Sequence, residues 1–188
     1  MTRRVLRTVS EAPISVAEVF LEDQYINIKS GDLIGYSTRK GSLLTKFLLE
    51  IVRILTKSEF SHVGIAWVEN GKLLLLEAVP PVIHIGSLLS MGSFYHIPMN
   101  IQWEDNYDAF MLEHIGDKYS ILDAIRGFFG YTNDRNDNWQ CAELANKIYK
   151  EMGIDLNNAY TPAELIKAAL IERDASITYI NLDLEHLR

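Results

Sequence analysis

Hydrophobic and polar residues alternate in several short segments of the chain, and this period of two is typical of strands with one buried face. One such segment is 24–29, and the turn residues Ser30-Gly31-Asp32 lead from it into a second strand candidate at 33–37. The pattern therefore predicts a pair of strands near the start of the folded domain. Shorter strands are predicted farther along the chain, at 82–85, 94–98 and 176–182.

The middle of the chain carries the clearest pairing signal. Two apolar segments, 61–68 and 73–79, flank Asn70-Gly71. This dipeptide is the one most typical of a two-residue hairpin turn, because both of its residues adopt a positive φ at low cost. We therefore predict an antiparallel hairpin over these segments.

The same turn predicts the register of the hairpin. If Glu69 pairs with Lys72, paired residue numbers sum to 141, and Gly64 faces Glu77. Alternate residues of a strand share a face, so His62 and Glu77 are expected diagonally on one side of the hairpin. Gly64 has no side chain and is expected to leave room for the carboxylate to lean toward the imidazole.

Other segments repeat their apolar residues at the helical period. Apolar positions from 139 to 152 fall three and four residues apart and stop at Gly153, which predicts an amphipathic helix. Thr161-Pro162-Ala163-Glu164 forms a capping box and predicts a last helix that ends near Arg173. Further helices are predicted at 16–21, 42–57, 104–115 and 120–129.

Strands joined by hairpins and mixed with helices favour the α+β class, with an antiparallel sheet packed against helices, over a doubly wound parallel sheet. The chain has 188 residues, of which 48% are hydrophobic and 23% charged, and this fits one globular domain. We assign residues 24–188 to this domain and residues 1–23 to an N-terminal extension.

Composition narrows the possible functions. The formal net charge of −7 argues against binding to nucleic acid by bulk charge. No apolar run reaches the roughly 20 residues that a bilayer span needs. The first residues lack the apolar core of a signal peptide, which favours a cytoplasmic or phage-associated location. A lone cysteine cannot form an intramolecular disulfide or a zinc site of the CxxC type, and no cofactor is predicted.

Two interpretations of the single cysteine, Cys141, remain open. It begins the apolar face of the helix predicted at 139–152, so it could be an inert core thiol. With Asn138 as N-cap, however, Cys141 lies in the first turn, where the helix dipole and free N–H groups stabilise a thiolate. The same N–H groups would stabilise an oxyanion formed when the sulfur attacks a carbonyl.

A thiol nucleophile needs a base, and the hairpin offers His62 with Glu77 to orient it. The alternative is an ordinary polar pair that faces water. Glu77 follows four leucines and precedes Ala78 and Val79, an expensive place for an unpaired charge. The other histidines are interpreted as satisfied or surface residues: His84, His96, His114 and His186.

Six short motifs, taken in order, resemble the circularly permuted NlpC-type papain-like cysteine hydrolases, and the YiiX-like branch most of all. In this order the histidine strand precedes the cysteine helix. The motifs are Gly31-Asp32-Leu33-Ile34, Ser61-His62-Val63-Gly64-Ile65, Glu77, Gly116-Asp117-Lys118-Tyr119-Ser120, Trp139-Gln140-Cys141-Ala142-Glu143-Leu144 and Thr161-Pro162-Ala163-Glu164-Leu165.

The resemblance implies a small papain-like fold in which Cys141 is the nucleophile, His62 the general base and Glu77 the residue that orients the base. It also implies Tyr36 and Gln140 as candidates on the oxyanion or substrate side, with Tyr119 in a supporting role. The related lecithin:retinol acyltransferase branch has a second histidine where this chain has Glu77, which favours the YiiX-like branch.

The function that this resemblance implies is a peptidase or amidase that cleaves an amide or ester through an acyl-thioenzyme, with a peptide, small-molecule or lipid-like substrate such as a cell-wall amide. Two alternatives stay open: an acyltransferase or thioesterase of the lecithin:retinol acyltransferase type, and an inert binding or virion structural protein. The helix at 42–57 is rich in basic residues. Its broad apolar face favours a place in the core over contact with a membrane surface.

Overall fold

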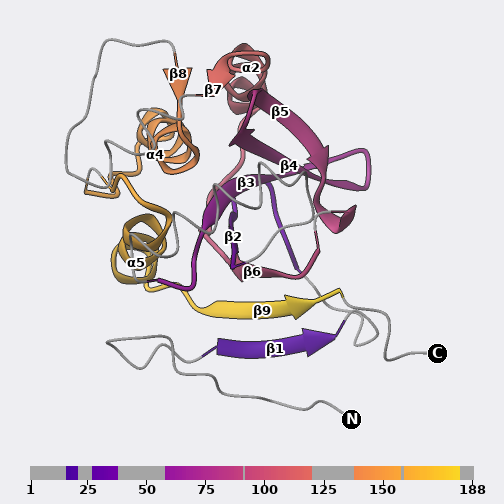
Figure 1. The fold of residues 1–188 in the computed structure, drawn as a ribbon, viewed down its shortest axis with the longest axis vertical. Coiled ribbons are helices and arrows are strands. Elements are labelled where there is room, and N and C mark those ends of the chain that lie inside the picture. The colour runs from indigo at the N-terminus through magenta and orange to yellow at the C-terminus, as the bar shows by residue number, and fades with distance from the viewer. Residues whose placement is uncertain are drawn as a thin grey trace.

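A nine-stranded sheet packed against helices makes up the part of the chain that the computed structural model describes, which is residues 16–20, 27–37, 58–90, 92–119, 138–157 and 159–182 (Figure 1). The strand order is β1-β9-β6-β2-β3-β4-β5-β7-β8. The strands are β1 (Val16–Phe20), β2 (Leu33–Tyr36), β3 (His62–Glu69), β4 (Lys72–Val79), β5 (Val82–Ser87), β6 (Phe94–Ile97), β7 (Lys118–Tyr119), β8 (Asn138–Trp139) and β9 (Ile177–Asn181).

The seven inner strands, from β9 to β7, pair antiparallel, and only the outermost pairs, β1 with β9 and β7 with β8, are parallel. Three α-helices accompany the sheet in the described ranges: α2 (Asp105–Glu113), α4 (Cys141–Glu151) and α5 (Pro162–Glu172). The predicted α+β class is therefore confirmed. The helices predicted at 42–57 and 120–129 lie outside the described residues.

The predicted hairpin is confirmed as β3 and β4. Its register follows the predicted sum from Glu69↔Lys72 to Ile65↔Leu76. The prediction of open space at Gly64 is wrong. A Cβ atom there would lie 2.8 Å from both the Leu76 carbonyl oxygen and Leu75 Cδ1. Gly64 thus permits close approach of the two strands.

Two predictions for the N-terminal region are wrong. Val16–Phe20 is strand β1, parallel to β9, where a short helix was expected. Of the strand predicted at 24–29, residues 27–29 are not a strand, and residues 24–26 lie outside the described residues. Both edges of β2 pair with other strands, β3 and β6. The Lys29 N–H instead donates to Asp32 Oδ2 at the turn.

The helices begin at local caps. Thr161 caps α5 with the predicted capping box. The N-cap of α4 is Gln140 and not Asn138, because β8 pairs with β7 and holds residue 138 in the sheet. Cys141 is still in the first turn of α4, as predicted.

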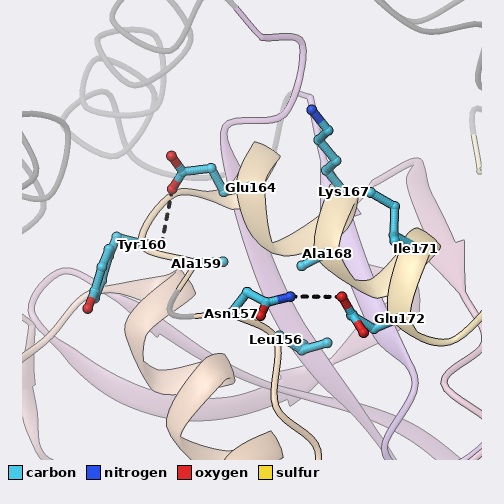
Figure 2. A pocket seen from close by; sticks show the side chains of 9 residues that line it. All are labelled: Leu156, Asn157, Ala159, Tyr160, Glu164, Lys167, Ala168, Ile171 and Glu172. Carbon is cyan, nitrogen blue, oxygen red and sulfur yellow. Dashed lines mark hydrogen bonds between the residues drawn. The ribbon is translucent and has the colours of Figure 1, made fainter.

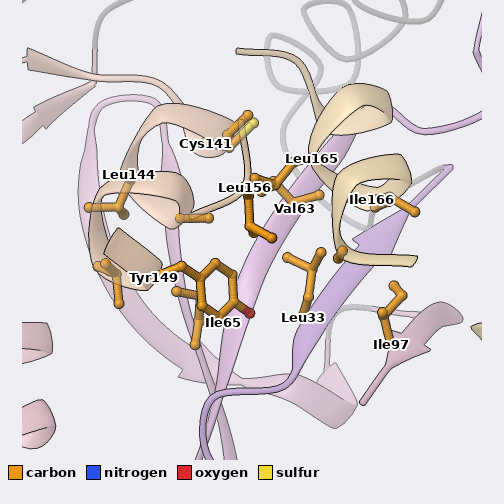
Figure 3. Packing of buried hydrophobic residues seen from close by; sticks show 14 of the residues in the cluster. Leu33, Val63, Ile65, Ile97, Cys141, Leu144, Tyr149, Leu156, Leu165 and Ile166 are labelled. Atoms are coloured by element: carbon orange, nitrogen blue, oxygen red, sulfur yellow. The ribbon is translucent and has the colours of Figure 1, made fainter. Parts of the chain in front are cut away.

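Among the described residues, buried hydrophobic side chains form two clusters. The larger one contains Leu33, Val63 and Ile65 of the sheet together with buried residues of α4 and α5 (Figure 3). The second includes Tyr36, Leu75 and Phe94. Within the described ranges, no helix has the length and apolar character that a bilayer span requires.

Replacement of Gly64 by alanine should lower the free energy of unfolding by about 1–3 kcal/mol, because the new Cβ meets a backbone carbonyl that cannot rotate away. Urea unfolding measures this change. Gly35→Ala is the control, because its Cβ would meet the flexible end of Ile166. An equal or larger loss in Gly35→Ala would contradict the argument.

Candidate active site

The β3–β4 hairpin brings together the predicted base and the residue predicted to orient it. His62 Nε2 lies 2.7 Å from Glu77 Oε2, and both residues are about 1% exposed. A buried carboxylate is costly unless it is paired. The diagonal contact that the register predicts is therefore present, and it is buried from water.

The thiol of Cys141 lies at the first residue of α4, where it is 7% exposed. The positive end of the helix dipole and the first-turn N–H groups meet at this position. Gln140 is the cap, and its side chain accepts hydrogen bonds from the N–H groups of Ala142 and Glu143. Its amide nitrogen donates to the Tyr160 carbonyl and so ties the start of α4 to the segment before α5.

A narrow gap separates the start of α4 from the β3–β4 hairpin. Cys141 and Glu77 both line it, although they lie 64 residues apart in sequence. The gap is too narrow for a water molecule. Figure 3 shows Cys141 at the start of α4, among the buried side chains of the larger cluster.

The pKa of His62 reflects the burial of its ring and the groups around it. Burial alone lowers this pKa. The charge of Cys141, its hydrogen bond to the ring and the Glu77 carboxylate act in the opposite direction and raise the pKa of His62 from 6.5 to about 9. Since Nε2 faces Glu77, Nδ1 is the ring nitrogen left for the thiol. The site thus favours a charged imidazole beside Cys141.

Tyr119 also belongs to the surroundings of the thiol. Tyr119 of β7 pairs with Trp139 of β8, which lies two positions before Cys141. Burial first, and the charge of Cys141 second, hold the pKa of the Tyr119 phenol above its usual range. The phenol therefore stays protonated near the sulfur.

A side-chain cluster anchors the strand that leads into α4. Asp117 Oδ2 lies 3.1 Å from His114 Nδ1 and accepts a hydrogen bond of 3.1 Å from Trp139 Nε1. The His114 ring also packs edge-on against the Trp139 ring, with centroids 5.0 Å apart. The sequence alone indicated only a motif around Asp117, and the structure shows that this motif holds β8 and hence the position of Cys141.

The structure places Tyr36 beside the base. Tyr36 pairs with His62 across β2 and β3, and the two ring centroids are 6.1 Å apart. Tyr36 belongs to the second hydrophobic cluster, whereas Cys141 belongs to the first. Gln140 acts as a helix cap. An oxyanion or substrate role for either residue stays a prediction.

His84 is the residue at this site that sequence reasoning passed over. It pairs directly with Glu77 across β4 and β5, and its Nε2 lies 3.3 Å from Glu77 Oε1. A strand at 82–85 was predicted, and pairing it with β4 across Pro80-Pro81 places His84 opposite Glu77. The register of this strand pair therefore could have identified His84 as a neighbour of Glu77.

A second depression lies beside α5, with a cavity volume of about 340 Å³ (Figure 2). It is lined by Leu156, Asn157, Ala159, Tyr160, Glu164, Lys167, Ala168, Ile171 and Glu172. Tyr160 and Glu164 at its rim are joined by the hydrogen bond from the Tyr160 N–H to Glu164 Oε2. Cys141 and His62 are not among the lining residues.

Comparisons with known proteins give matches among solved structures only. No protein-family model matches the chain, and no curated protein matches it. A crystal structure of the metalloprotein YiiX from Escherichia coli O157:H7, of the family DUF1105, aligns with 80% of this chain and 87% of its own, at 18% identity and a TM-score of 0.48. In the described part of this chain, no group of three or more His, Cys, Asp or Glu side chains could hold a metal ion.

The raised pKa of His62 predicts a pH-dependent stability. The folded protein binds the imidazole proton more tightly than the unfolded chain does, so the stabilisation is fully present below pH 6.5 and is lost as the pH rises through about 9. The cost of His62→Gln in unfolding free energy should therefore be largest below pH 6.5 and shrink toward pH 9. Urea titrations over this range measure it, and a cost that grows with pH would contradict the assignment.

Proposed function

We propose that the chain is a cysteine hydrolase that cleaves an amide or ester through an acyl-thioenzyme on Cys141. The observation that carries the proposal is the buried His62–Glu77 pair beside the only thiol, with the pKa of His62 raised to about 9. A thiol that contacts an imidazole, which in turn contacts a carboxylate, makes up a nucleophilic triad.

In the proposed reaction, His62 takes the proton from Cys141, and the thiolate attacks the substrate carbonyl. The Gln140 cap occupies the N–H groups of Ala142 and Glu143, so the N–H of Cys141 is the first-turn donor left for the oxyanion. The imidazolium then gives its proton to the leaving amine or alcohol. Water, activated by His62, hydrolyses the thioester, releases the acid and restores the thiol.

The position of Glu77 supports its role as the residue that orients the base. Its carboxylate holds Nε2 of His62, which leaves Nδ1 for proton transfer with the thiol. In serine proteases Nδ1 faces the carboxylate and Nε2 faces the nucleophile, so the two nitrogens have the opposite roles there. In both arrangements the carboxylate selects the tautomer and stabilises the imidazolium. Tyr119, a protonated phenol near the sulfur, is a second oxyanion donor in this proposal.

Alkylation of Cys141 by iodoacetamide tests the proposal. The wild-type rate should stay high at pH 6, below the ordinary thiol pKa of about 8.5. His62→Ala should reduce the rate at pH 6 by about tenfold or more and return the profile to an ordinary thiol. Peptide mapping by mass spectrometry identifies the alkylated residue.

A matched control is His96→Gln. His96 Nε2 lies 2.7 Å from Asp32 Oδ2, so this residue is also a buried histidine paired with a carboxylate, but it joins β6 to the residue before β2. Its replacement should leave the alkylation profile unchanged. A wild-type profile with an ordinary thiol pKa, unaffected by His62→Ala, would show that Cys141 is an inert thiol in a binding or structural protein.

Acyl-enzyme formation gives a second readout. With activated acyl esters, intact mass spectrometry should show one acyl group on the wild type and none on Cys141→Ala. Turnover should fall on the order of 10³-fold or more in His62→Ala. A labelled acyl donor should yield the free acid, whereas a labelled acceptor other than water would show acyl transfer instead of hydrolysis.

A further inference from the structure

The two oxygens of Glu77 face two different histidines. Oε2 lies 2.7 Å from His62 Nε2, and Oε1 lies 3.3 Å from His84 Nε2. The triad of the proposed function uses only the first of these contacts. The second contact joins the same carboxylate to β5, on the other side of β4.

His84 differs from the rest of the site in its exposure. The side chain of Glu77 is 0% exposed, whereas that of His84 is 37% exposed. A fully buried carboxylate loses its hydration, and each oxygen then needs a partner from the protein. His84 gives Oε1 an ionic partner at 3.3 Å, while 37% of its own side chain is exposed.

We propose that His84 is a positioning residue that holds the Glu77 carboxylate toward His62, so that the site is a chain of four groups, Cys141, His62, Glu77 and His84. The proposal rests on the proposed function for its catalytic meaning. Its structural content, that His84 controls the support Glu77 gives to His62, can be tested without turnover.

The cross-strand geometry supports a specific role. Glu77 and His84 are directly opposite in register, so their side chains are cross-strand neighbours on one face of the sheet. Residues on β4 and β5 therefore keep the two groups in contact without a flexible loop. His62, which reaches Glu77 from β3, is held from the opposite strand.

Few other charges face His84 in the described ranges. On β5 itself the ionisable group is His84. On β4 the facing group is Glu77. Beside β5, Lys118 pairs with Val82 and is exposed, and Asp117 contacts Ile83 through its backbone while its carboxylate contacts His114 and Trp139. On β3, beyond Glu77, the facing group is His62. The Glu77 carboxylate is thus the charge that His84 contacts directly.

Loss of the His84 ring removes an ionic contact of Glu77 and should make the Glu77 anion harder to bury. Glu77 would then take up a proton at a higher pH and would support the imidazolium of His62 less well. In iodoacetamide profiles, the acid limb of Cys141 reactivity should move to higher pH by about one unit in His84→Ala. His84→Gln retains a neutral N–H donor and should restore most of the wild-type profile.

Histidine titration by NMR on ¹⁵N-histidine-labelled protein gives the independent readout. The pKa of His62 should fall in His84→Ala and recover in His84→Gln. An unchanged or higher pKa of His62 in His84→Ala would overturn the proposal, as would equal behaviour of the two variants. A residue with only a packing role would lower the unfolding free energy and leave both profiles in place.

The two hypotheses fail in different ways. If wild-type Cys141 reacts as an ordinary thiol, the proposed function is wrong, and the His62 titration still decides the role of His84. If wild-type Cys141 has the expected profile and His62 titrates identically in His84→Ala, the hydrolase stands and the role of His84 is wrong. His96→Gln, which disrupts the other buried pair, serves as control in both measurements.

Discussion

The carboxylate of Glu77 is the charge around which the candidate site is organised. It lies in the middle of an antiparallel sheet with a side chain that is 0% exposed, where an unpaired charge would cost several kcal/mol. The strand order β3-β4-β5 resolves this cost, because it places a histidine on each side of β4. The same order presents one imidazole to the start of α4.

The cysteine helix is held at its N-terminus from two directions. On one side, β8 pairs with β7, and the Trp139 indole donates to Asp117. On the other, Gln140 caps the helix and reaches the Tyr160 carbonyl. Contacts from two distant segments, residues 117–119 and Tyr160, thus fix the first turn of α4. Because cysteine has a short side chain, the position of the backbone at the start of α4 largely determines the position of its sulfur.

Local signals account for what the sequence predicts well. The Asn70-Gly71 turn sets the hairpin register because its backbone twist suits only a two-residue connection, and the capping box at Thr161 starts α5 by contacts within four residues. The contact between His62 and Glu77 follows from that register. The class of the fold follows from the alternation of strands and helices.

Long-range pairing accounts for what local patterns missed. A segment such as Val16–Phe20 carries no sign of the strand that it meets, because β9 comes from the opposite end of the chain. Asn138 has the right chemistry for an N-cap, yet its pairing with β7 moves the cap to Gln140. His84 was accessible to register reasoning and was missed because it was assessed as a single residue.

The neighbours of β9 set an order of assembly. β9 lies between β6 and β1, so β1, the first of the described strands, can join the sheet only after β9, the last of them, has been made. During synthesis on the ribosome, β6 therefore has one open edge and β1 has no partner until Ile177–Asn181 emerges. A truncation before that segment would leave β6 with an unpaired edge, a template for pairing with other chains, even though every residue of the candidate site would already be present.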